Sequence, residues 1–305
     1  MRAPALLLAL LLPGQALAHA GHLHWTGIET TWTWDLWVTL PLALSGGLYA
    51  TGVARLWRRA GIGRGVRVWQ AGCFELGWGL LVLALVAPLH WLGERLFVAH
   101  MVEHEILMAV SAPLLIVARP VGAMLWALPQ AWRPGIGAIG RVPSLARIWS
   151  ILTNAPVATI LHGAALWVWH IPALYEAALA DPWLHWLQHV GFFGTALLFW
   201  RALLQGPERA RAYGAAVFYL FATSLHTGFL GILLAIARQP IYPAQTGAAS
   251  EWGLSPLEDQ QLAGLVMWIP AGLVYAGAAL ALAGLWIARS ASDLRTGGRH
   301  AYTAR

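Results

Sequence analysis

The chain has 305 residues, of which 59% are hydrophobic and only 10% are charged. A soluble domain carries about 25% charged residues, so this composition excludes an ordinary soluble protein and indicates a polytopic membrane protein. The formal net charge of +6 comes from arginines that lie in short clusters between apolar runs. Such clusters are typical of topology signals in a lipid bilayer, and we therefore exclude nucleic acid as a partner.

The first 18 residues have the three parts of a secretory signal peptide, which are a charged start, a short apolar stretch and small residues before the cleavage site. Residues 19–35 then form a histidine-rich segment, which we expect outside the membrane. It begins HAGHLH, and imidazole nitrogens in this segment could bind Cu(II), with His19 as an accessory ligand in a receiving arm. The alternative is an unstructured amino terminus.

Seven further stretches approach the length of about 20 apolar residues that a membrane-spanning helix requires. They predict an all-α membrane helix bundle over 36–288, followed by a tail at 289–305. We expect the spans at about 36–57, 68–89, 97–118, 151–171, 184–204, 213–237 and 261–288. The intervening segments 119–150 and 238–260 are predicted to be surface-lying connectors.

The arginines are concentrated in alternate segments between the predicted spans. The segments 55–67, 119–150, 201–212 and 289–305 hold most of them, and the alternate segments hold only Arg95 and Arg238. By the positive-inside rule the arginine-rich segments face the cytoplasm. The mature amino terminus is therefore predicted outside and the carboxyl terminus inside.

Histidines gather at the opposite, outer end of the predicted helices. His100 and His104 are spaced i, i+4, so on a helix their imidazoles lie on one face about 6 Å apart and can share one metal ion. Met108 extends this stripe. His185 and His189 repeat the spacing at the same end of another helix that runs in the same direction.

Any one of these histidines could simply decorate the membrane interface or join two helices. Two pairs at equal depth, with His170 on a third helix, favour a metal site, because imidazole is the commonest metal ligand. His162 and His226 lie deeper, and we expect interhelical hydrogen bonds there, with nearby hydroxyl groups as partners for His226.

The metal is less closely specified by the sequence. The single cysteine, Cys73, excludes thiol-based copper carriage, whereas thioether groups beside imidazoles favour Cu(I). Carboxylates would favour zinc or iron, and we expect two of the three at this end (Glu103, Glu105 and Asp259) to orient imidazoles. Our hypothesis is copper. The expected ligands are His100, His104, His170, His185, His189 and Met267, with Asp259, Met101, Met108, His226 and His19 as accessory positions.

At these residues the sequence resembles the CtaG-type cytochrome c oxidase assembly factors of bacterial cytoplasmic membranes. The resemblance extends over about 36–288 and rests on four motifs: HMVEH followed by SAPLLIVARP (100–120), LWVWHIPALYEAAL (166–179), HWLQH (185–189) and LEDQQLAGLVMWIP (257–270). It implies a seven-helix, non-enzymatic protein that delivers copper to the oxidase or inserts it. The implied partners are oxidase subunits and a copper donor protein. Asp259 becomes a residue of interest only through this resemblance.

Two other classes of function remain open. A haem or di-iron redox protein would use histidines from facing helices, such as His104 and His189. The further histidine clusters typical of membrane di-iron enzymes are absent from the sequence. A transporter would need polar groups beneath His162 and His226, where the sequence offers few.

Overall fold

The computed structural model describes residues 32–205 and 213–302, with side chains to residue 290. The chain divides into Met1–Thr30 and Thr31–Arg305, and the described residues belong to the second unit. They form helices and connecting turns with no strand, which confirms the predicted all-α class. The predicted signal peptide, most of the segment 19–35 and His19 lie outside the described residues.

Six long apolar segments in the described part of the chain have the length and composition to cross a membrane. Their bounds agree closely with the expected spans. They are α1 (Leu36–Ala60), α2 (Val68–Leu85), the composite segment Phe97–Ala118, α11 (Pro182–Gln205), α12 (Tyr213–Ala235) and the first part of α14 (Pro256–Tyr302).

The seventh predicted span, 151–171, corresponds to a broken helix. It consists of α8 (Pro143–Leu152) and α9 (Ala155–Trp169), which meet at a bend of 67°. Pro156 lies in the first turn of α9. Because proline has no backbone N–H and clashes with the preceding turn, the helix cannot run straight through this point. The bundle has seven spans only if this bent pair is counted as one.

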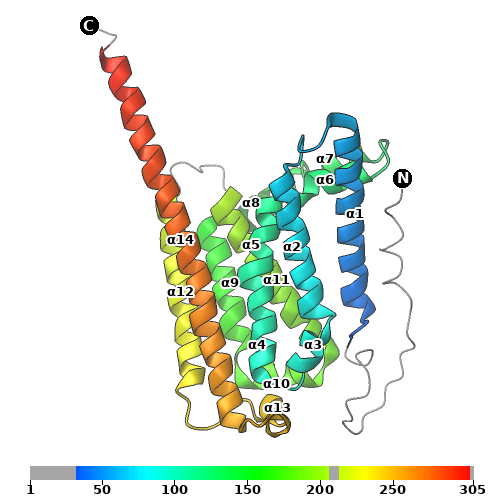
Figure 1. Ribbon diagram of the computed structural model, residues 1–305, viewed down its shortest axis with the longest axis vertical. Helices are drawn as coiled ribbons and strands as arrows, with labels where there is room; N and C mark the ends of the chain where they lie inside the picture. Colours follow the sequence, from blue (N-terminus) through cyan, green and yellow to red (C-terminus); the bar gives the residue numbers. More distant parts are fainter. Residues whose placement is uncertain (1–31, 206–212, 303–305) are drawn as a thin grey trace. The chain divides into compact units, whose positions relative to one another are not determined.

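Short helices fill the connectors at both ends of the spans (Figure 1). At one end lie α3 (Pro88–Gly93), α10 (Pro172–Ala180) and α13 (Pro243–Thr246), with the 3-10 helix η3 (Ala249–Trp252) in the same connector as α13. At the other end lie α6 (Pro120–Ala127) and α7 (Arg133–Ile139), followed by α8. Among the described residues, the first end carries most of the histidines and the second carries most of the arginines.

The third span changes helix type within the membrane. It starts as α4 (Phe97–Glu105), continues as the π-helical turn η2 (Ile106–Ser111) and ends as α5 (Ala112–Ala118). Within η2, the Ala112 N–H donates to the Leu107 carbonyl, and the indole N–H of Trp200 donates to the Met108 carbonyl at 2.9 Å. A side chain from α11 thus satisfies a backbone group in this turn. π-turns inside α-helices are frequent at functional sites, and this one directly follows the HMVEH motif.

Helices α12 and α14 pack with their backbones close together. A Cβ atom added at Gly264 would lie 2.5 Å from the Gly231 carbonyl oxygen, and one at Gly231 would lie 2.7 Å from the Gly264 oxygen. Only glycine fits both positions, as in other close helix contacts in membranes. This contact fixes the helix that carries Asp259 and Met267.

Candidate metal centre

Five histidines meet at the end of the bundle formed by α3 and the first turns of α4 and α11. They are His90 on α3, His100 and His104 on α4, and His185 and His189 on α11. We call these five residues the histidine cluster. Ring centroids are 4.2 Å apart for His100 and His104, 4.6 Å for His185 and His189, 5.0 Å for His104 and His189, 5.5 Å for His100 and His185, and 5.8 Å for His90 and His185.

The starts of α4 and α11 are both fixed by aspartates. Asp259, which is fully buried on α14, accepts hydrogen bonds from the backbone N–H groups of Phe97 and Val98 at 2.8 and 2.9 Å. Asp181 accepts hydrogen bonds from the first N–H groups of α11, including that of Trp183 at 2.7 Å. These contacts satisfy N–H groups that have no partner within the helix and define where each helix begins. They therefore set the position of both HxxxH motifs.

Glu103 joins the helices at the centre of the cluster. Its side chain has 0% exposure, and its Oε1 atom lies 2.9 Å from His90 Nδ1 and 2.8 Å from His189 Nε2. The three ligand atoms lie within 4.8 Å of one another. Two ligands about 2.1 Å from one ion are at most about 4.2 Å apart. Small side-chain movements would therefore place all three groups on one metal.

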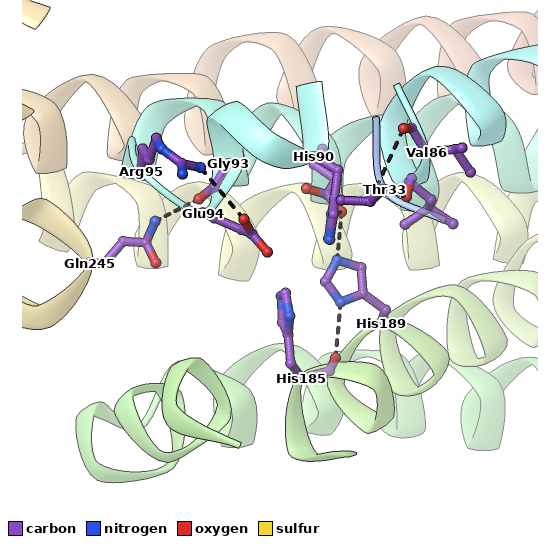
Figure 2. A network of polar contacts seen from close by, with 11 residues as sticks. Thr33, Val86, His90, Gly93, Glu94, Arg95, His185, His189 and Gln245 are labelled. Carbon is purple, nitrogen blue, oxygen red and sulfur yellow. Dashed lines mark hydrogen bonds and ion pairs between the residues drawn. The ribbon is translucent and has the colours of Figure 1, made fainter. Parts of the chain in front are cut away.

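The His189 ring is held in the orientation expected of a ligand. Its Nδ1 lies 3.0 Å from the His185 carbonyl oxygen, so Nδ1–H is the donor (Figure 2). In a neutral imidazole the other nitrogen, Nε2, then carries a lone pair. That lone pair faces a Glu103 oxygen at 2.8 Å. The contact is favourable only with a proton or a metal ion between the two atoms, and histidine ligands in metal sites commonly donate their second N–H to a carbonyl.

Six buried imidazole and carboxylate atoms at this end of the bundle have no hydrogen-bond partner among the described residues. Unpaired buried polar groups are rare in folded proteins because each carries a desolvation cost. Those found here are His100 Nε2, both nitrogens of His104, His170 Nε2, His185 Nε2 and Glu103 Oε2. Every one of these atoms can bind a metal ion, and the residues present thus fit a metal site.

His90 completes the network from outside the spans. Its burial lowers the pKa of the imidazole, but the hydrogen bond and the charge of Glu103 act in the opposite direction, and the net pKa lies above the ordinary value. The contact with Glu103 therefore makes His90 easier to protonate than a free imidazole. The sequence places His90 at this end, but it was not among the expected ligands.

His170 lies beside the cluster. Its Nδ1 donates to the Leu166 carbonyl at 2.7 Å, which leaves a lone pair on Nε2. Its ring contacts Tyr175 and Phe192, with centroids 6.3 and 5.9 Å away. These two aromatic rings in turn contact His100 and His104, respectively. His170 is thus one aromatic ring removed from the five clustered imidazoles.

The sulfur atoms expected near the site lie in apolar surroundings. Met101 and Met267 are buried in one hydrophobic cluster with Phe97 and Tyr175, and Met108 belongs to the larger core of the bundle. Asp259 caps α4, as described above, and so has a structural contact of its own. These positions support the histidine cluster through packing and helix capping.

The two deeper histidines differ in their contacts. His162 Nδ1 lies 3.2 Å from the Thr195 hydroxyl oxygen, which joins α9 to α11 as expected. His226 Nδ1 has no hydrogen-bond partner among the described residues. The neighbouring Thr227 hydroxyl donates instead to the Thr223 carbonyl within its own helix, because a threonine in a helix readily bonds the preceding turn.

Other supporting contacts come from the 238–260 connector, for which the sequence predicted only a surface position. The Gln245 amide donates to the Gly93 carbonyl at 2.7 Å, and the Tyr242 hydroxyl donates to the His170 carbonyl at 2.6 Å. Both polar side chains are buried. Glutamine and tyrosine in a connector give no sequence signal for such contacts, since they depend on how the connector folds back on the bundle.

A cavity of about 570 Å³ opens beside the histidine cluster. Its walls come from α1, α2, α10 and α11, and include Trp37, Leu42 and Phe193. His90, His185 and His189 line its polar side. The cluster can therefore be reached through this cavity.

Comparison with known families shows which family the chain matches. The sequence model of the family described as cytochrome c oxidase caa3 assembly factor matches residues 47–289. The matched region contains all five clustered histidines and Glu103. No curated protein and no solved structure matches the chain.

Proposed function

We propose that this chain, which belongs to the family of cytochrome c oxidase caa3 assembly factors, binds copper at the histidine cluster and passes it to an oxidase subunit during assembly. The observation that carries this proposal is the buried group of imidazole and carboxylate atoms without hydrogen-bond partners. Copper is the cargo of the protein, and the role is delivery without catalysis. The proposed partners are subunits of the oxidase and a donor protein that supplies the copper.

The ligand types suit copper. Imidazole nitrogens bind late first-row metals, and among divalent ions Cu(II) binds such sites most tightly. Glu103, His90 and His189 form the tightest ligand set, and His100, His104 and His185 provide further nitrogen atoms beside it. The carboxylate also suits Cu(II) or zinc, so competition between metals is part of the test below.

The surplus of ligands favours transfer over permanent storage. A copper ion needs about four ligands, or fewer as Cu(I), whereas the cluster and Glu103 offer six side chains. An ion can then exchange one ligand at a time without losing its whole coordination shell. The cavity lined by His90, His185 and His189 gives a partner protein access to the same atoms.

The predicted topology places this site at the outer face of the bacterial cytoplasmic membrane. The arginine-rich segments, as far as the structure describes them, lie at the opposite end of the bundle, and arginine-rich segments favour the cytoplasmic side. Copper delivered from outside the cytoplasm would then reach the histidine cluster without crossing the bilayer.

The test begins with metal loading of the full chain in mild detergent. Wild type, His100→Ala/His104→Ala and the matched control His162→Ala are loaded separately with Cu(I), Cu(II) and Zn(II), and bound metal is measured by mass spectrometry. We expect about one copper per chain in the wild type and the control. We expect the double variant to bind copper at least about a hundredfold more weakly, since loss of supporting groups alone costs about 10–100-fold.

Function is then measured in cells that lack the chromosomal copy of the gene. Each variant is expressed in them, and the copper content and activity of the oxidase are determined. We expect mature oxidase with the wild type and the control, and copper-deficient oxidase with the double variant, although all three fold as judged by thermal unfolding. Equal copper binding by the double variant, tighter binding of zinc than of copper, or a haem absorption band would each contradict the proposal.

A further inference from the structure

A second cavity lies at the arginine-rich end of the bundle. It has a volume of about 500 Å³. The residues around it come from the turn before α2 and the start of α2, the end of α5, the end of α11, the start of α12 and the carboxyl-terminal half of the α14 span. Its polar lining consists of Arg67, Gln70, Arg119, Gln205 and Tyr213. This site is separate from the histidine cluster. In both α2 and the third span, the cavity residues lie at one end of the span and the histidine cluster is near the other end.

Among the described residues, the side chains that line this cavity carry positive charge only. Arg67 and Arg119 are both exposed, and no described aspartate or glutamate lines the cavity. Neither arginine forms an ion pair with any residue that the structure describes. A guanidinium group is always protonated and presents a planar set of donors that matches phosphate oxygens. The two charged groups here therefore suit an anion, because a guanidinium has no lone pair to offer a metal ion.

Arg119 is held in an unfavourable backbone conformation. Its φ of 53° and ψ of 56° lie in the left-handed region, and it is the only described non-glycine residue with a positive φ. The following residue is Pro120, which further restricts the backbone of the residue before it. Arg119 ends α5 and begins α6 at the same point. Residues kept in such conformations cluster at functional sites, and here the conformation places a guanidinium at the cavity.

The rest of the cavity is apolar. Val117, Leu282 and Leu285 line it together with Trp69. A free phosphate ion or a nucleotide would gain little binding energy from these apolar side chains. A phospholipid, in contrast, can place its phosphate at the arginines and its acyl chain against the apolar side chains. Basic pockets between helices at the cytoplasmic side of membranes are suited to anionic lipid head groups, and the arginine-rich end is the predicted cytoplasmic end.

We propose that this cavity binds an anionic phospholipid, with Arg67 and Arg119 contacting the head-group phosphate and the acyl chain lying against Leu282 and Leu285. The lipid would bridge the ends of α2, α5 and α14. The proposal concerns neither the metal nor the histidine cluster.

The test uses the full chain in detergent and native mass spectrometry. The probes are phosphatidylglycerol, phosphatidylcholine with the same acyl chains, and inorganic phosphate. Variant Arg67→Gln/Arg119→Gln is compared with the matched control Arg58→Gln/Arg64→Gln, which removes two exposed arginines that do not line the cavity. We expect one phosphatidylglycerol per chain. Affinity should fall at least about tenfold in the cavity variant, since each basic residue contributes measurably to anionic lipid binding, and stay near that of the wild type in the control.

Three results would overturn the proposal. These are equal phosphatidylglycerol binding by the cavity variant and wild type, equal binding of phosphatidylcholine and phosphatidylglycerol by wild type, and displacement of the lipid by inorganic phosphate at similar concentration. The last result would assign the site to a free anion. A further variant, Arg119→Lys, keeps the charge but loses the planar donor pair, and we expect intermediate affinity from it. Thermal unfolding of every variant checks that the comparison is made between folded proteins.

Discussion

The two ends of this bundle both carry basic side chains, but these differ in burial, partners and chemistry. At the histidine end, the imidazoles of α4 and α11 are mostly buried around one buried carboxylate, Glu103, and several ring nitrogens lack partners. At the arginine end, the guanidinium groups of Arg67 and Arg119 are exposed, and no carboxylate from the described part of the chain lines their cavity.

This difference decides which ligand each end can bind. A neutral imidazole offers a lone pair and so binds a Lewis acid, whereas a guanidinium has no lone pair to offer and binds only anions or acceptors. Burial strengthens the first preference, because an unpaired nitrogen in the protein interior has no water to bond. Basic side chains therefore form a cation site at one end of the bundle and an anion site at the other.

The sharpest test of the histidine end is Glu103→Gln. The change keeps the shape of the side chain but removes the charge that balances a bound cation, and it replaces one of the two carboxylate oxygens, which contact His90 and His189 through Oε1, by an NH2 group that has no lone pair for a metal. We expect copper affinity to fall by up to about a hundredfold, at the upper limit for loss of a group around a metal. Equilibrium titration with a copper chelator measures this change. Glu105→Gln, two residues away and half-buried, is the control, and an equal effect of both changes would argue against a specific role for Glu103.

The second test asks whether the histidine end depends on the α4 cap. Asp259→Ala leaves the N–H groups of Phe97 and Val98 without their partner. We expect the free energy of unfolding to fall by about 2 kcal/mol, as for loss of a buried charged cap, which appears as a lower thermal unfolding midpoint. Glu258→Ala, at an exposed position in the same turn, should change the midpoint less. A midpoint equal to that of wild type would show that Asp259 has another role.

A smaller effect is expected from Gly93→Ala. A Cβ atom at this position would lie 2.9 Å from Glu103 Oε2, which is too close for a real contact. The carboxylate must shift, and we expect copper affinity to fall by about threefold to tenfold, below the effect of removing a supporting group. Gly79→Ala on α2, where an added Cβ meets no atom within 4 Å, is the control. Unchanged copper affinity in Gly93→Ala would mean that the carboxylate position is not limiting.

The smallest effects are expected when a variant at one end of the bundle is tested for ligand binding at the other end. His100→Ala/His104→Ala should retain phosphatidylglycerol as wild type does, and Arg67→Gln/Arg119→Gln should retain copper. The two sites lie at opposite ends of shared helices and have no lining residue in common, so their effects should be independent. Native mass spectrometry of lipid and metal on the same samples measures both. Loss of copper from the arginine variant would show that the two ends are coupled.

Much of the fold follows from the sequence because membrane helices and the i, i+4 spacing are local properties. The spans and the positions of HMVEH and HWLQH at one end could be predicted on this basis. The central position of Glu103 and the approach of His90 could not, since they depend on how α3 packs against α4 and α11. A sequence motif pointed to Asp259, but its partner Val98 on α4 is 161 residues away in the sequence, so this contact could not be predicted. The predicted thioether ligand, Met267, lies among apolar side chains, where hydropathy alone would place it.

The π-turn η2 changes the direction in which the side chains of α5 point around the helix axis, relative to those of α4. One added residue in a helix turns everything beyond it by about 100°. Without such an insertion, a helix face that directs His100 and His104 toward α11 would also dictate which side chains of α5 meet α2, where Gly77 leaves room for Leu114. With it, the ligand face and the packing face are set independently. Deleting a single residue within 106–111 would change the composition and the hydropathy of the span very little. It would nevertheless rotate the packing face of α5 away from α2 when His100 and His104 still face α11.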